Sequence, residues 1–150
     1  MAAGSALKRN MVTRQVGSML LLRQNREAPS DAEWDECLGL LKRFSADFSK
    51  AKVLVITDAG APTPEQRKRL AAILQGQRVR VAVVSEALKF RFIVSSIALF
   101  IPDIASFRMY ELSGAYDHLK LGPHERRTAD LMIGEMGAML GTPQRKSIPA

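Results

Sequence analysis

The chain has 150 residues, a formal net charge of +7 and 47% hydrophobic residues, which fits one globular domain with a substantial core. No apolar run reaches the roughly 18 residues that a membrane-spanning helix needs, and residues 1–10 lack the apolar segment of a signal peptide. Cys37 is the only cysteine, so the chain can form neither an intramolecular disulfide nor a cysteine-based metal site. We therefore expect a protein of the reducing cytoplasm.

The first part of the chain predicts an arm followed by a β-hairpin. Residues 1–10 are small and polar, as is typical of a flexible N-terminal arm. Extended segments are expected at 12–13 and 19–22, because they are apolar and rich in residues that favour strands. The pair Gly17-Ser18 between them predicts the tight turn of a hairpin.

A helix is expected at 31–48. Ser30 and Glu33 have the spacing of a capping box, in which each side chain binds the other residue's backbone N–H. Trp34 and Cys37 lie in or beside the apolar stripe of this helix. Residues of these types on such a stripe usually pack in the core, so we assign them no chemistry.

The strand–loop–helix unit at 53–74 is the centre of the predicted fold. Residues 53–56 form a continuous apolar run rich in β-branched residues, which fits a strand that is buried on both faces. The loop at 57–63 is rich in turn residues. Thr63 can cap the next helix, and Pro64 suits its first position, where no backbone N–H is missed.

The rest of the domain repeats this alternation. A buried strand is expected at 79–84, a helix that is apolar nearly all round at 86–101, a short strand at 104–107 and a helix at 109–121. Strands that alternate with helices favour an α/β domain with a mostly parallel sheet, and the initial hairpin makes that sheet mixed. We expect this domain to span 11–121.

Several of these segments resemble one known family. The sequence VLVITDAGAPTPEQR at 53–67 is similar to the strand, D-x-G-x-P-x-x-x-x-R segment and helix of the SpoIIAA-like, or STAS-like, bacterial proteins. The sequence VRVAVV at 79–84 looks like the family's next strand, and residues 107–119 look like its closing segment. The resemblance covers roughly residues 12–121, and it implies a sheet of four or five strands with helices packed against it.

The family also implies a function, which is regulation through a protein partner. In its anti-sigma-factor antagonists, a partner kinase phosphorylates a serine at the start of the helix after the central strand. Here Ala59, Gly60 and Ala61 stand where the serines are expected, and Thr57 and Thr63 are the only hydroxyls in the loop. These two threonines are therefore the residues that a kinase could modify. The missing serines argue against a phosphorylation switch, and the binding role does not require one.

We expect the partner to bind the loop and the start of the helix that follows it. The residues that carry this prediction are Thr57, Asp58, Gly60, Thr63 and Arg67. They follow the carboxyl end of a predicted parallel strand, which is where α/β sheets usually place their functional residues. For Asp58 the favoured role is structural, because aspartate commonly hydrogen-bonds its own turn.

No group of residues favours an enzyme, a metal site or a cofactor. His118 and His124 lack partners at metal-ligand spacing. Ser95 lies inside an apolar helix rather than in a nucleophile elbow, and Gly60 lacks the companion glycines of a phosphate loop. The basic run 67–69 has no interleaved aromatic residue for base stacking, so nucleic acid is not the expected partner.

We therefore expect a non-enzymatic regulatory or scaffolding module that works through protein–protein interaction or self-association. The alternative is a carrier of a small apolar ligand or lipid, of CRAL-TRIO-like character. Phe90, Phe92 and Phe100 lie in the predicted apolar helix and could line a pocket for such a ligand.

The segment after Leu121 is expected to be an addition to this domain. Residues 122–140 have helical periodicity, and residues 141–150 form a polar, basic tail. The apolar stripe of the helix includes Met132, Ile133, Met136 and Met139. It could fold back on its own sheet or pack against a second copy or a partner. We favour the intermolecular interface, because methionine-rich stripes suit adaptable binding surfaces.

Overall fold

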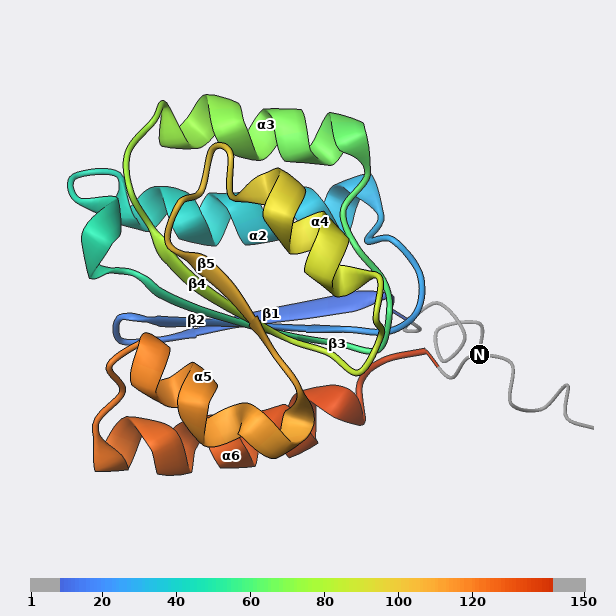
Figure 1. Ribbon diagram of the computed structural model, residues 1–150, viewed down its shortest axis with the longest axis vertical. Coiled ribbons are helices and arrows are strands. Elements are labelled where there is room, and N and C mark those ends of the chain that lie inside the picture. Colours follow the sequence, from blue (N-terminus) through green and yellow to red (C-terminus); the bar gives the residue numbers. More distant parts are fainter. Residues whose placement is uncertain (1–8, 142–150) are drawn as a thin grey trace, which may run out of the picture.

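The computed structural model describes residues 9–141 as an α/β fold built on one five-stranded sheet (Figure 1). The strands lie side by side in sequence order: β1 (Met11–Val16), β2 (Met19–Gln24), β3 (Lys52–Thr57), β4 (Arg80–Val84) and β5 (Ile104–Phe107). Strand β1 is antiparallel to β2, and all other neighbours are parallel. The predicted class, a mixed and mostly parallel sheet with packed helices, is confirmed.

The hairpin forms where the sequence predicts it. Val16 pairs with Met19, so Gly17 and Ser18 make the whole connection between β1 and β2. Gly17 has a φ of +58°, a left-handed conformation that glycine adopts without steric cost.

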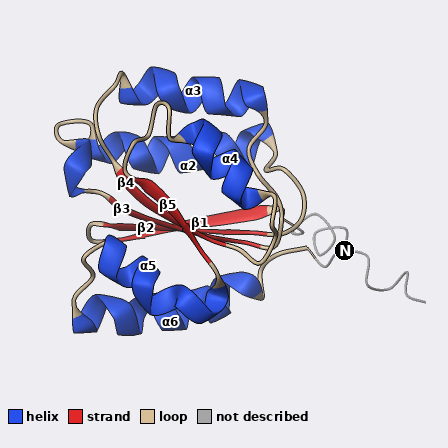
Figure 2. Cartoon of the chain, viewed as in Figure 1, coloured by secondary structure: helices blue, strands red, loops and turns tan. Residues whose placement is uncertain are grey.

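The helices divide into two layers, one on each face of the sheet (Figure 2). Helices α2 (Asp31–Leu41), α3 (Pro64–Leu74) and α4 (Phe90–Ile97) connect successive parallel strands and cover one face. Since the strands advance across the sheet in one direction and such connections share one hand, their helices fall on the same side. Helices α5 (Leu112–His118) and α6 (Pro123–Gly137) cover the opposite face. None of the described helices is both long and apolar enough to cross a bilayer.

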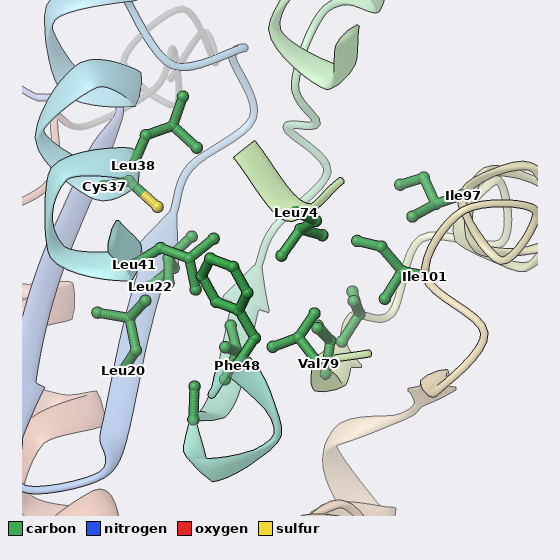
Figure 3. Packing of buried hydrophobic residues seen from close by; sticks show 14 of the residues in the cluster. Leu20, Leu22, Cys37, Leu38, Leu41, Phe48, Leu74, Val79, Ile97 and Ile101 are labelled. Atoms are coloured by element: carbon green, nitrogen blue, oxygen red, sulfur yellow. The ribbon is translucent and has the colours of Figure 1, made fainter. Parts of the chain in front are cut away.

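Each layer has its own apolar core. The side chains of β3 and β4 alternate between the two cores, so Val53 faces α2, α3 and α4 whereas Leu54 faces α5 and α6. Figure 3 shows the first core, where Leu38 and Leu41 of α2 and Ile97 of α4 point toward the same interior. This arrangement confirms that the run 53–56 is a strand buried on both faces.

The two predicted helix starts are also confirmed. The Ser30 hydroxyl accepts a hydrogen bond from Glu33 N, and the Glu33 carboxylate accepts one from Ser30 N. Thr63 makes the corresponding pair with Gln66 at the start of α3, where Pro64 occupies the first helical position. Trp34 and Cys37 are buried in the first core, as expected.

The expected helix bounds were wrong at three places. The helix expected at 31–48 ends at Leu41, and two 3₁₀ turns, Lys42–Phe44 and Phe48–Lys50, lead on to β3. Asp47 caps the second of these turns, which brings Phe48 into the core. The segment expected as one helix at 109–121 is a 3₁₀ turn, Met109–Glu111, followed by α5.

The helix expected at 86–101 covers only Phe90–Ile97. Its predicted first turn is absent because the Glu86 carboxylate accepts hydrogen bonds from the backbone N–H and the side chain of the segment after β5. At the other end, residues 98–100 form a turn that returns buried Ile101 to the core. Helical periodicity does not predict the contact of Glu86 with residues 22 and 23 positions away along the chain.

The prediction that α6 is an addition outside the domain is wrong. Ala129, Met132 and Met136 are buried against the sheet, and the α6 segment is part of the second core. After α6, Leu140 pairs with Arg9 beside β1, and Gly141 N donates a 2.7 Å hydrogen bond to Arg9 O. Because the three connecting helices cover only one face, α5 and α6 must cover the other.

Two residues of the expected N-terminal arm, Arg9 and Asn10, belong to the fold. Residues 1–8 and the expected tail from residue 142 onward lie outside the described part of the chain. Arg9 and Asn10, however, are held by α2 and the segment before it. The backbone N–H of Asn10 donates to the Glu33 carboxylate, and its side-chain amide donates to Ala28 O.

Candidate functional site

The loop after β3 is bound tightly to the segment that follows β2. Asp58 N donates a hydrogen bond to Gln24 O at 3.0 Å, and Gly60 N donates one to Asn25 O at 2.8 Å. Within the loop, the Thr57 hydroxyl donates to Gly60 O at 2.7 Å. The loop therefore has one defined position at the carboxyl edge of the sheet.

Gly60 is required there by close approach of two main-chain segments. A Cβ atom at this position would lie 2.1 Å from Glu27 O and 2.7 Å from Asn25 O. Neither carbonyl is the end of a flexible side chain, so the backbone itself would have to move. Gly60 therefore fixes the loop and offers no side chain to a partner.

The start of α3 is fixed by Gln66, which is only 2% exposed. Its side-chain amide donates to Pro29 O at 2.8 Å and to the Asp31 carboxylate at 3.1 Å. The indole N–H of Trp34 donates to Gln66 O at 2.9 Å. The sequence analysis identified Thr63 as the helix cap but did not identify Gln66. Gln66 could have been found, because it stands three residues after Thr63, which is the spacing of a capping box.

The two threonines differ as candidates for modification. Thr57 is 3% exposed, and its hydroxyl is occupied by the bond to Gly60 O. A kinase cannot reach this hydroxyl in the folded chain, so the interpretation of Thr57 as a modification site is wrong. Thr63 is half-buried, and its hydroxyl accepts a hydrogen bond from Gln66 N at 3.1 Å. A phosphate on Thr63 stays a prediction.

Asp58 and Arg67 are the two predicted residues that still offer charged side chains to a partner. Asp58 is exposed, and no residue among 9–141 donates a hydrogen bond to its carboxylate. The interpretation of Asp58 as a residue that binds its own turn is therefore wrong. Arg67 is half-buried and donates to Pro62 O at 2.9 Å, which leaves part of its guanidinium open.

The carboxyl ends of β4 and β5 carry a second group of residues, which sequence patterns missed. Four large apolar or aromatic side chains are exposed there, and we call them the β4–β5 edge surface: Leu88, Phe92, Met109 and Tyr110. Phe92 is 79% exposed and Tyr110 is 84% exposed. Single exposed apolar residues are ordinary, but aromatic and methionine side chains on neighbouring segments, here two loops and the first turn of α4, are typical of binding surfaces.

The segments that carry Leu88, Met109 and Tyr110 are joined by hydrogen bonds, and Phe92 follows in the first turn of α4. The Glu86 carboxylate accepts a 2.7 Å hydrogen bond from Met109 N and a 3.3 Å hydrogen bond from Arg108. Leu88 and Arg108 also border one shallow pocket of about 50 Å³ between the loops. Lys89 and Arg91 are exposed beside Leu88 and Phe92, whereas the exposed carboxylates Glu86 and Glu111 lie near Met109 and Tyr110. The rim is therefore basic only on its α4 side.

The predicted C-terminal interface does not exist as a free surface. Met136 is 1% exposed and Met132 is buried, both against the sheet, so neither can contact a second copy or a partner. Ile133 is half-buried and packs on the same core. Met139 is more open, and its sulfur accepts a 3.3 Å hydrogen bond from the Arg14 guanidinium. The stripe therefore belongs to the protein's own core.

A cavity of about 100 Å³ lies between the sheet and helices α2, α3 and α4. Its lining is almost entirely apolar and includes Leu22, Cys37, Val83 and Val94. Of the three phenylalanines expected to line a pocket, only Phe90 does so. Phe92 faces outward, and Phe100 packs against the core without reaching the cavity.

Cys37 is predicted to be chemically inert in the folded protein. Burial raises the pKa of its thiol to about 12, so almost no thiolate is present at neutral pH. Because the unfolded thiol ionises near pH 9 and the folded thiol does not, Cys37 lowers stability as pH rises between these values. At pH 8, a disulfide reagent such as DTNB should label denatured chain within seconds and folded chain only at its rate of unfolding. Rapid labelling of folded protein would contradict the burial.

His118 and Ser95 make structural contacts. A His118 ring nitrogen lies 2.8 Å from Asp103 O, and the Ser95 hydroxyl donates to Arg91 O within α4. The Tyr116 hydroxyl donates to Asp130 at 2.6 Å; burial and this bond raise the pKa of Tyr116. Within the described residues, no three or more His, Cys, Asp or Glu side chains are placed to hold a metal.

The site as a whole is an edge of the sheet where loops are fixed by backbone contacts and side chains are presented outward. Asp58 and Arg67 lie after β3, and the β4–β5 edge surface lies beside them in strand order. Comparison of the chain with protein-family models, curated proteins and solved structures gives no match.

Proposed function

We propose that this protein is a non-enzymatic regulatory or scaffolding module that binds a protein partner at the carboxyl edge of its sheet. The observation that carries the proposal is the β4–β5 edge surface of Leu88, Phe92, Met109 and Tyr110. The exposed aromatic side chains Phe92 and Tyr110 provide large apolar anchors with few rotatable bonds to order on binding. The resemblance to STAS-like signalling proteins supports the same class of function.

The charges around the surface define the partner's chemistry. Lys89 and Arg91 are exposed on the rim, whereas Glu86 is already hydrogen-bonded to Arg108 and Met109. The favoured partner therefore presents an apolar face with acidic residues opposite Lys89 and Arg91. Rim charges mainly steer association and fix orientation, and the buried anchors supply most of the affinity.

Asp58 and Arg67 keep the role expected from the sequence, as polar contacts on the same edge. We expect Asp58→Ala and Arg67→Glu to weaken partner binding several-fold while the domain stays folded. Their effects should be smaller than those of the aromatic anchors, because both side chains remain partly in water at a rim. Thr57 and Gly60 contribute by holding the loop in place.

The proposal is tested by photo-crosslinking in the host, with the crosslinking residue at Phe92 or Tyr110 in the full chain. The matched control is position Leu131, which is 66% exposed on α6, on the opposite side of the sheet. We expect a discrete adduct of defined mass from positions 92 and 110 and none from 131. With the partner purified, Phe92→Ala should raise the Kd for the partner about 30-fold, which is the effect of removing a typical aromatic anchor.

Two outcomes would overturn this assignment. One is equal crosslinking from all three positions, which would mean non-specific contact. The other is an unchanged Kd for both Phe92→Ala and Tyr110→Ala, which would place the partner elsewhere on the molecule. An adduct with twice the mass of the chain would identify the partner as a second copy.

A further inference from the structure

We propose that the cavity beneath α4 is a binding site for a small, neutral, apolar molecule of about the size of benzene or less. The cavity has a volume of about 100 Å³ and lies between β2, β3 and β4 on one side and α2, α3 and α4 on the other. This site is separate from the outward-facing β4–β5 edge surface, and the proposal does not depend on a protein partner.

The volume is unusual for a protein interior. Cores are packed as densely as organic crystals, with few voids larger than one water molecule. One water occupies roughly 30 Å³ of liquid, so the cavity has room for several. An engineered apolar cavity of about 150 Å³ stays dry and takes up benzene or xenon. The cavity here is somewhat smaller, which suits a compact hydrocarbon group.

The lining selects against water and against charge. The side chains around the cavity come mainly from Leu, Val, Ile and Phe residues, and none carries a charge. Gln24 contributes an amide, but its nitrogen already donates to Glu27 O at 3.4 Å. Cys37 stays a neutral thiol, because its pKa is about 12. A buried water needs two to four polar partners, and a charged ligand needs a counter-charge, so a neutral apolar ligand fits best.

Helix α4 is the wall that can admit such a ligand. It contributes Phe90, Ile93, Val94 and Ile97 to the lining. Among the described residues, its only side-chain hydrogen bond is from Ser95 to Arg91 O, inside the helix. Apolar packing alone therefore holds this eight-residue helix against the sheet, and it has no side-chain cap at its start. A small outward shift of α4 breaks no side-chain hydrogen bond or ion pair to another element.

The test is an NMR titration of the full chain with benzene, and separately with xenon gas under pressure. Saturable shifts are expected for backbone amides of Val83, Val94 and their neighbours around the cavity, and not for amides of α6. Val94→Ile and Val83→Ile each add one methylene to the lining and should weaken benzene binding at least tenfold. Leu99→Ala is the matched control, because Leu99 is 88% exposed in the turn that follows the same helix, and the benzene affinity of this variant should equal that of the parent chain.

Each result decides the proposal. Thermal melting shows which variants fold, and Val83→Ile supplies the test on the strand side of the cavity if Val94→Ile disturbs the helix. Shifts that grow linearly without saturation, or saturable shifts that both isoleucine variants leave unchanged, would overturn the proposal. Binding lost in Leu99→Ala but kept in both isoleucine variants would place the ligand on the outer surface and would also overturn the proposal.

Discussion

A chain that ends at Gly122 is expected to lose cooperative folding. Without α6, the α5/α6 face of the sheet loses the cover that Ala129, Met132 and Met136 give it. Burial of each methionine is worth about 1.5–3 kcal/mol, and a domain of this kind is stable by only about 5–15 kcal/mol in total. The truncation also removes Gly141, whose backbone N–H donates to Arg9 O beside β1. Circular dichroism during heating should show no sharp transition.

Two point variants in the full chain test the contribution of α6 to stability with a smaller perturbation than truncation. Met136→Ala should lower the free energy of unfolding by about 2–5 kcal/mol, the usual cost of a large-to-small change in a core. Leu131→Ala is the matched control on the same helix, because Leu131 is exposed, and it should change stability by less than about 0.5 kcal/mol. Urea denaturation of both proteins gives the comparison. A truncated chain that melts like the full chain, or equal values for the two variants, would restore the idea of an appended helix.

Gly60→Ala should destabilise the protein by about 3 kcal/mol or more. The added Cβ would fall within 3 Å of main-chain atoms of Asn25 and Glu27, which cannot rotate away as a side chain can. Relief of this clash would pull the loop after β3 away from the segment after β2. The backbone bonds from Asp58 to Gln24 O and from Gly60 to Asn25 O would then lengthen or break.

Gly39→Ala is the control for this second prediction. Gly39 lies in α2 and is exposed, and a Cβ atom added there would meet nothing within 4 Å. Alanine at such a helical position usually stabilises by up to about 1 kcal/mol. Chemical denaturation should therefore move the midpoints of the two variants in opposite directions. A Gly60→Ala protein with a free energy of unfolding within about 1 kcal/mol of the parent would show that the loop yields easily.

Local sequence signals determined the elements that depend on near neighbours. The capping residues Ser30 and Thr63 mark the starts of α2 and α3, and Gly17 marks the hairpin turn. The apolar run 53–56 predicts a strand covered on both faces. These features were predictable because each arises from interactions within a few residues, such as a cap hydrogen bond, a positive φ or a continuous apolar run.

The placement of α6 was decided only by the tertiary structure. Helical periodicity shows that Met132 and Met136 share a stripe, but it does not say what the stripe packs against. The strand order supplies the answer, because connections of one hand along a sheet in sequence order leave one face bare. A signal was present in the sequence, since a strand apolar on both faces requires two helical layers.

The candidate site also has features that the sequence predicts and features that only the tertiary structure shows. The sequence placed a functional loop after β3, but only the folded chain shows that Thr57 is buried and that Asp58 is exposed. An apolar pocket beside this helix was expected as the alternative, but of the three phenylalanines only Phe90 lines it. The β4–β5 edge surface was not predictable, because it depends on where α4 begins. Glu86 sets that start by binding the segment after β5, 22 and 23 residues away along the chain. Side-chain exposure is a property of such long-range contacts, and no local pattern encodes them.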